Sequence, residues 1–207
     1  REILSLCGQD TQCASRLPDA ENQLVGLLSD LDAGHCASLG VTSVTLKQML
    51  RSLGYYGPNH AIIPALIGRL IRCDPGDEEA VTDLYQALWG GSEATQAFST
   101  VVFFQQVSSE LWLTPEMPAP QDVVDYLDGV YENTILSFGM GYDRHDVYLS
   151  WPVYDDPYDD QWASSDVPIL MLQGQLDPST PHDFALDVAA NFDGAHQTWV
   201  AFPHAAH

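Results

Sequence analysis

Two residues near the end of the chain have the side-chain types of an acid–base pair. Asp177 lies in the segment LQGQLDPSTP and His207 lies in AFPHAAH, and each follows a short apolar run. A carboxylate that accepts a hydrogen bond from imidazole Nδ1–H fixes the tautomer of the ring and stabilises its protonated form. We therefore predict that these two side chains meet. The alternative for Asp177 is a structural role, because aspartate before proline is common in turns.

The segments around these two residues have the pattern of one βαβ unit. The apolar run Val167–Gly174 is typical of a strand buried on both faces of a parallel sheet. Thr180–Phe192 has a helical pattern, and Thr198–Phe202 is a second apolar strand. Chemistry in open α/β sheets lies beyond the carboxyl ends of such strands. A sheet of only two strands needs further strands for stability. If those further strands are missing, we expect an exposed apolar edge at Val167–Gly174.

These motifs resemble the C-terminal segment of α/β-hydrolases. The strings VPILMLQGQLDPSTP and FPHAAH are most similar to the proline iminopeptidase and tripeptidyl aminopeptidase-like group of serine peptidases. The resemblance implies a Ser-His-Asp triad in which Asp177 orients the histidine and His207 is the base, in the chain order of this fold. The family usually has glycine at two positions that His204 and Ala206 occupy here, which leaves His204 as the alternative base.

The resemblance extends more loosely to the earlier part of the chain, which has a C-x5-C pair near its start and several helical patterns. It implies a partial α/β-hydrolase sheet with a mainly helical lid, the lid over residues 1–150 and the hydrolase segment over residues 151–207. Aminopeptidases of the group bind the amino group of the substrate with acidic lid residues. The resemblance gives this role to Glu110, in SSELW, beside Trp112 as an apolar wall. The alternative for Glu110 is an ordinary surface or capping contact.

The third member of such a triad is missing from the sequence. The nucleophile of this fold lies in a G-x-S-x-G turn between a strand and a helix, and no such motif occurs here. Ser92 and Ser108 lie outside a strand–turn–helix context, and we expect them in loops or at the surface. We expect the serine in a partner segment, the N-terminal half of the hydrolase domain. Arg1 is not an initiator methionine, and nothing resembles a signal peptide, so we expect the chain to begin inside a longer or processed product.

The four cysteines all lie in the first third of the chain, and none forms a C-x-x-C pair typical of zinc knuckles. An even number in one region favours disulfides and an oxidising, extracellular compartment. Three pairings are possible, and we favour Cys7–Cys13 with Cys36–Cys73 because the first pair closes a short local loop. The alternative is four buried thiols in a cytosolic protein.

Apolar residues at helical spacing predict helices through most of the chain before the βαβ unit. The expected helices are Ala20–Leu31, Val44–Leu53, Ile62–Leu70, Glu78–Trp89 and Gln121–Leu136. Val101–Phe104, with the sequence VVFF, has β character instead.

The charge balance excludes one class of partner. Seven Lys and Arg against 29 Asp and Glu give a net charge of −22, and such a surface repels nucleic acid. No apolar run is long enough to span a membrane. No cofactor is implied, and a zinc site of His196, His204 and His207 lacks a recognised ligand spacing. The resemblance thus implies a secreted serine hydrolase acting on peptides; the alternatives are an esterase of the same fold and a helical binding module with a vestigial hydrolase tail.

Overall fold

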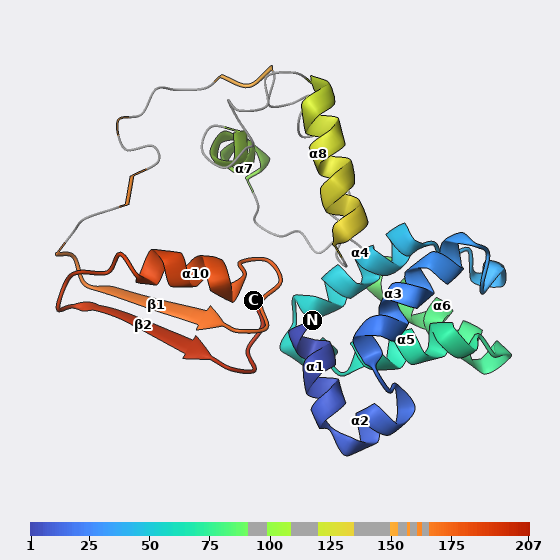
Figure 1. The fold of residues 1–207 in the computed structure, drawn as a ribbon. Coiled ribbons are helices and arrows are strands. Elements are labelled where there is room, and N and C mark those ends of the chain that lie inside the picture. The colour runs from blue at the N-terminus through green and yellow to red at the C-terminus, as the bar shows by residue number, and fades with distance from the viewer. Residues whose placement is uncertain (91–98, 109–119, 135–149, 153–156, 158–160, 163–165) are drawn as a thin grey trace. The chain divides into compact units, whose positions relative to one another are not determined.

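The structure, a computed structural model, describes residues 1–90, 99–108, 120–134, 150–152, 157, 161–162 and 166–207. The chain divides into two compact units, one formed by Arg1–Gly91 with Trp162–His207 and the other by Ser92–Gln161. Figure 1 shows the elements of both. Asp177 and His207 belong to the first unit. The boundary at residue 150 between a lid and a hydrolase segment stays a prediction.

Helices make up the N-terminal part of the first unit and share an apolar core. They are α1 (Glu2–Gln9), α2 (Thr11–Arg16), α3 (Ala20–Asp32), α4 (Ser43–Gly54), α5 (Ile62–Arg72) and α6 (Pro75–Trp89), with the short 3-10 helices η1 (Ala37–Leu39) and η2 (Gly57–Asn59). The four helices expected in this region are confirmed, with small shifts at their ends. Their apolar faces are buried together, with Leu24, Leu46, Met49 and Leu70 almost fully excluded from solvent.

Side chains at the helix ends explain where several of these helices begin. Asp10 Oδ1 accepts a hydrogen bond from the Cys13 N–H at 2.7 Å at the start of α2. Thr42 Oγ1 accepts one from the Thr45 N–H at 3.3 Å at the start of α4. Such caps satisfy backbone donors that the first turn leaves unpaired. Pro75 occupies the first turn of α6, where its missing N–H costs nothing.

Two disulfides join these helices in the pairing favoured from the sequence. Cys7–Cys13 links α1 to α2, with a Cα–Cα distance of 5.2 Å. Cys36–Cys73 links the residue before η1 to the end of α5, with a Cα–Cα distance of 5.7 Å. All four cysteines are therefore paired. Each disulfide restricts the unfolded chain and so stabilises the folded helices.

The C-terminal part of the first unit is the expected βαβ unit (Figure 1). It consists of β1 (Ile169–Gly174), α10 (His182–Ala189) and β2 (Gln197–Phe202). The two strands are parallel, with Ile169 opposite Gln197 and Gly174 opposite Phe202. Their carboxyl ends therefore lie side by side, and the segments that leave them carry Asp177 and His207.

The βαβ unit exposes much of its apolar surface within the described part of the chain. Leu170 of β1 is 65% exposed, and Leu172, Phe184 and Phe202 are exposed as well. A strand of a complete parallel sheet would be covered on both faces. The burial predicted for Val167–Gly174 is thus absent for most of its residues, with Gln173 as the buried exception. The exposed apolar edge expected without further strands is present.

Helix α7 (Thr100–Gln106) and helix α8 (Pro120–Asn133) lie in the second unit. The prediction of β character for Val101–Phe104 is wrong, because these residues form α7. The Ser99 hydroxyl accepts a hydrogen bond from the Val102 N–H at 3.4 Å, and this cap favours a helix over the weak strand preference of valine and phenylalanine. The helix expected near Gln121 is confirmed as α8.

No described helix is long and apolar enough to cross a membrane.

Candidate active site

Asp177 is held in the loop that follows β1 by hydrogen bonds from its own loop. Its Oδ1 accepts from the N–H groups of Ser179 at 2.7 Å and Thr180 at 3.0 Å. Its Oδ2 accepts from the Thr180 hydroxyl at 2.6 Å. The side chain is only 5% exposed. The turn-forming role proposed as an alternative for Asp177 is therefore real, and it fixes the orientation of the carboxylate.

The same carboxylate binds His207, as the sequence predicts. His207 Nδ1 lies 2.9 Å from Asp177 Oδ2. An ionised carboxylate only accepts hydrogen bonds, so Nδ1 carries the proton and donates it. This tautomer leaves Nε2 as the basic nitrogen, and it has no hydrogen-bond partner among the described residues. The imidazole side chain is 48% exposed, so the ring offers a free base beside a buried acid.

Four hydrogen bonds and a buried position act on the ionisation of Asp177. Burial by itself raises the pKa of this carboxyl group, since it disfavours the charge. Hydrogen bonds from the Thr180 hydroxyl and N–H, from His207 and from the Ser179 N–H outweigh burial, so the pKa lies below the ordinary aspartate value. Asp177 is thus an ionised acceptor at neutral pH, which is the state that an imidazole partner requires.

Stability should depend on pH through this carboxylate. With the folded pKa below the unfolded value of about 3.9, the contribution of Asp177 is fully present above that unfolded value. It is lost as pH falls through the folded pKa, because the unfolded chain takes up its proton first. We expect the difference in unfolding free energy between wild type and Asp177→Asn, measured by urea titration, to shrink between pH 6 and pH 3. A constant difference over this range would contradict the low pKa, and comparison with the variant cancels the titration of the other acidic residues.

The turn that carries His207 lies directly against the end of β1. The Gln175 N–H donates to the Phe202 carbonyl at 3.0 Å, and the Leu176 N–H donates to the Ala205 carbonyl at 3.0 Å. At Gly174 an added Cβ would meet the backbone oxygens of Ala205 and Ala206. Only glycine at this position allows the two chain segments to approach so closely. The position of His207 therefore depends on Gly174.

Replacing Gly174 with alanine should displace the His207 turn. The methyl group meets backbone oxygens rather than a flexible side chain, and such overpacking costs about 1–3 kcal/mol. We expect a matching loss of unfolding free energy by urea titration.

The matched control is Gly26→Ala within α3, where nothing lies within 4 Å of an added Cβ. It should leave the unfolding free energy unchanged or slightly raise it. Equal effects of the two substitutions would contradict the close approach at Gly174.

Helix α4 ends beside the same loop. The Tyr55 hydroxyl lies 3.0 Å from Ser179 Oγ, and the Tyr55 ring is 5.5 Å from the His207 ring, edge to face at 77°. A Cβ on Gly54 would lie 3.1 Å from Pro178 Cγ. The Asp177 loop is therefore packed on the helical part of the unit.

The remaining predicted residues have different outcomes. His204, the alternative base, is exposed and has no hydrogen bond to Asp177. Glu110 and Trp112, predicted to bind the substrate amino group, lie outside the described residues, as does Ser92. Ser108 is buried and not at the surface as expected, and it follows helix α7 rather than a strand. Its context is thus not that of a nucleophile turn.

The sequence analysis missed three residues that contact the pair. Thr180 and Ser179 lie within the D-P-x-T-P motif, and their hydroxyl and N–H donors could have been inferred from a turn centred on aspartate. Tyr55 carried no such signal, because its contacts reach a segment far along the chain.

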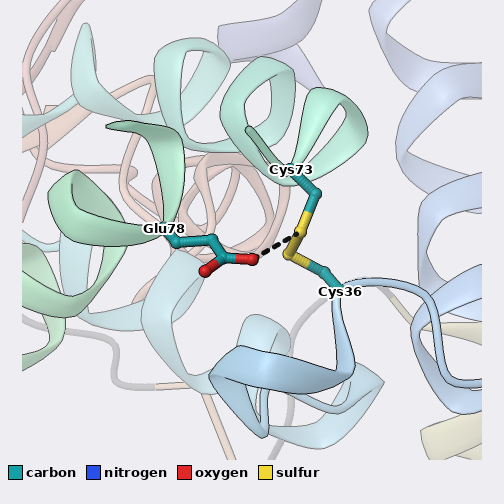
Figure 2. A group of neighbouring side chains, drawn as sticks. All are labelled: Cys36, Cys73 and Glu78. Atoms are coloured by element: carbon teal, nitrogen blue, oxygen red, sulfur yellow. Dashed lines mark hydrogen bonds between the residues drawn. A yellow bond between two sulfur atoms is a disulfide. The ribbon is translucent and has the colours of Figure 1, made fainter. Parts of the chain in front are cut away.

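One group of possible metal ligands occurs among the described residues, and it is already bonded. Cys36, Cys73 and Glu78 lie together, and Figure 2 shows the carboxylate pointing at the Cys36–Cys73 disulfide. Glu78 Oε1 lies 3.7 Å from Cys73 Sγ and accepts a hydrogen bond from the Ser38 hydroxyl at 2.6 Å. A disulfide provides no thiolate, which is the form of cysteine that binds metals. This group is therefore structural.

Comparison with known protein families gives a match to part of the chain. Residues 142–204 match the family model of TAP-like proteins, a segment that includes Asp177 and His204 and stops before His207. No curated protein and no solved structure gives a significant match. The match agrees with the resemblance seen in the sequence motifs and with the parallel strand pair. The C-terminal segment of this chain is therefore similar to TAP-like proteins, which supports a TAP-like α/β-hydrolase C-terminal domain.

Proposed function

We propose that the chain is the lid and C-terminal portion of a secreted serine hydrolase, a peptidase that releases N-terminal residues or short peptides. The observation that carries the proposal is the 2.9 Å hydrogen bond from His207 Nδ1 to Asp177 Oδ2. It lies at the carboxyl ends of two parallel strands, where open α/β sheets carry their chemistry. The TAP-like match over residues 142–204 supports a hydrolase.

In the proposed reaction His207 moves the proton and Asp177 holds the ring. His207 Nε2 takes the proton of a serine hydroxyl as the oxygen attacks the substrate carbonyl, and then gives it to the leaving amine. Asp177 remains ionised and stabilises the imidazolium through Nδ1. Water then attacks the acyl carbonyl while the same nitrogen accepts a proton from the water. The bond between the acyl carbon and the serine oxygen breaks, Nε2 returns the proton to that oxygen, and the acid product leaves. Both half-reactions need a free Nε2, which the tautomer inferred from the hydrogen bond to Asp177 provides.

The serine belongs to a partner segment, the N-terminal half of the hydrolase domain with its G-x-S-x-G turn. The exposed apolar side chains of the βαβ unit, Leu170, Leu172, Phe184 and Phe202, support this part of the proposal. An apolar surface of this kind is normally covered, and the free edge of a strand is normally paired. Further strands and helices of the same sheet would cover both.

Two further features support a secreted peptidase. The Cys7–Cys13 and Cys36–Cys73 disulfides favour an oxidising compartment. The sequence motifs resemble the tripeptidyl aminopeptidase-like group, and from that resemblance Glu110 binds the substrate ammonium beside Trp112. No nucleic-acid or membrane partner is proposed.

Labelling with a fluorophosphonate tests the proposal. The natural, full-length protein is treated with the probe, and the labelled peptide is identified by mass spectrometry. We expect the label on a serine within G-x-S-x-G, in a segment joined to or copurifying with this chain. Absence of labelling from folded, full-length material would favour a non-catalytic helical binding module instead.

Substrate comparison separates a peptidase from an esterase. A peptidase acting at N-termini should cleave a peptide with a free amino group and reject the same peptide after N-acetylation. An esterase of the same fold should hydrolyse p-nitrophenyl acetate and leave both peptides intact. Hydrolysis of the acetylated peptide at the same rate would rule out recognition of the amino group.

A further inference from the structure

A tyrosine from the helical part of the first unit contacts both the acid loop and the histidine. Tyr55 is the residue directly after α4. Its hydroxyl lies 3.0 Å from Ser179 Oγ, in the loop where the Ser179 N–H binds Asp177. Its ring lies 5.5 Å from the ring of His207, at 77°. One side chain thus links the two members of the acid–base pair from outside their own βαβ unit.

The Tyr55 hydroxyl has a second neighbour besides Ser179. Arg51 Nη2 donates to the Tyr55 hydroxyl oxygen at 3.5 Å, and the guanidinium carbon lies 5.7 Å from the centre of the tyrosine ring. Arginine has no acceptor, so the tyrosine oxygen accepts from Arg51. The same hydroxyl forms the hydrogen bond with Ser179 Oγ, in which either hydroxyl can donate. Both contacts restrict rotation of the Tyr55 side chain.

The backbone at Tyr55 is fixed as well. Gly54, the last residue of α4, packs so closely on Pro178 that an added Cβ would lie 3.1 Å from its Cγ. The Gly54 carbonyl also lies 2.9 Å from His60 Nε2, within hydrogen-bond distance. The end of α4 and the Asp177 loop are therefore in direct contact at Gly54 and Pro178. The contact between Tyr55 and Ser179 lies one residue further along in each segment.

His207 needs such support because its own contacts are few. Its side chain is about half exposed, and its one hydrogen bond among the described residues is to Asp177. A single hydrogen bond leaves the imidazole free to tilt about the Nδ1–Oδ2 direction. The aromatic contact with Tyr55 limits this tilt, and aromatic pairs prefer the edge-to-face geometry seen here.

We propose that Tyr55 is a positioning residue that sets the angle of the His207 imidazole while it holds the Asp177 loop through Ser179. The proposal rests on the proposed function for its effect on the rate of reaction, but the positioning itself does not depend on it. Tyr55 touches neither the serine nor the reacting carbonyl in this role. It therefore acts on kcat and not on the affinity for substrate.

Steady-state kinetics of the full-length protein test the effect on the rate. Tyr55→Phe and Ser179→Ala each remove the same hydrogen bond, and each should lower kcat by roughly threefold to tenfold. The double variant should lose no more than either single variant, because both delete one interaction. Tyr55→Leu also removes the ring and should lower kcat by roughly 100-fold. KM should stay within about twofold of the wild-type value in all of these variants, since none of them removes a contact that binds the substrate.

The neighbouring Tyr56 offers a matched control, since it is 60% exposed. Tyr56→Phe and Tyr56→Leu should leave kcat and KM unchanged. Equal losses at the two positions, or a rise in KM with constant kcat at Tyr55, would overturn the positioning role. Additive losses in Tyr55→Phe with Ser179→Ala would also overturn it.

Proton NMR of the same full-length protein tests the positioning without any activity. A hydrogen bond from His207 Nδ1–H to the Asp177 carboxylate gives a low-field proton signal, assigned by its loss in His207→Ala. We expect Tyr55→Phe to retain the signal, Tyr55→Leu to broaden or abolish it, and both Tyr56 variants to keep it. An unchanged signal in Tyr55→Leu would overturn the proposal. If wild type shows the signal but no hydrolysis, the proposed function fails and the NMR result alone decides the role of Tyr55.

Discussion

Replacing His207 with alanine is expected to lower kcat of the full-length hydrolase by roughly 10⁴-fold or more, with little change in KM. The reason is that His207 is the described histidine bonded to the buried carboxylate, at 2.9 Å. Without it, the serine has no base and the leaving group has no acid. The measurement is hydrolysis of a peptide substrate under saturating conditions, together with the rate of fluorophosphonate labelling.

His204→Ala is the decisive control for this prediction. His204 lies in the same turn, is exposed, and makes no hydrogen bond to Asp177. Its removal should leave kcat within about twofold of wild type, as expected for a surface substitution. The reverse pattern, with activity lost in His204→Ala and kept in His207→Ala, would assign the base to the other histidine and contradict the observed pairing.

Asp177→Asn is expected to lower kcat by roughly 10⁴-fold while the protein stays folded. Asparagine keeps the shape of the side chain, but its amide nitrogen is a donor and cannot accept a hydrogen bond. Whichever of the two carboxylate oxygens this nitrogen replaces, it then faces another donor. Both oxygens of Asp177 accept hydrogen bonds, from Thr180, Ser179 and His207. The histidine is then held in the wrong tautomer, with the proton on Nε2. Kinetics at pH 7 and circular dichroism on the same sample provide the test.

Asp183→Asn is the matched control, because its side chain is 95% exposed and lies in the first turn of α10 close to the same loop. Loss of this charge should change kcat by no more than about twofold. If both variants lose activity equally, the effect comes from the negative charge of the region and not from the hydrogen bond to His207.

The elements with a regular apolar pattern could be predicted from the sequence. The expected helices near Ala20, Val44 and Ile62 are α3, α4 and α5, because leucine and isoleucine at helical spacing must be buried on one side. The strand pair and the meeting of Asp177 with His207 follow from the rule that parallel strands end at a common edge. Each helix and strand was recognised from the residues of its own segment, and a general rule for parallel strands then placed the two strand ends together.

Distant contacts that follow from no rule of strand topology or cysteine pairing could not be predicted. The contact between Tyr55 and Ser179 joins residues 124 positions apart, and no local pattern signals it. The strand prediction for Val101–Phe104 failed for a different reason. The cap that Ser99 provides at the start of α7 outweighed the strand preference of these four residues. The sequence also did not predict that position 174 requires glycine. That requirement comes from the backbone oxygens of Ala205 and Ala206, which an added Cβ would meet.

The discontinuous first unit has a consequence for the order of folding. Its helical part ends at Gly91, and its βαβ part begins only at Trp162. At a synthesis rate of roughly 5–20 residues per second, the 124 residues from Tyr55 to Ser179 take roughly 6–25 s to emerge. The helices and the Cys36–Cys73 disulfide can form well within that time. The acid–base pair can thus be assembled only after the helical surface has had time to pack and to form its disulfide.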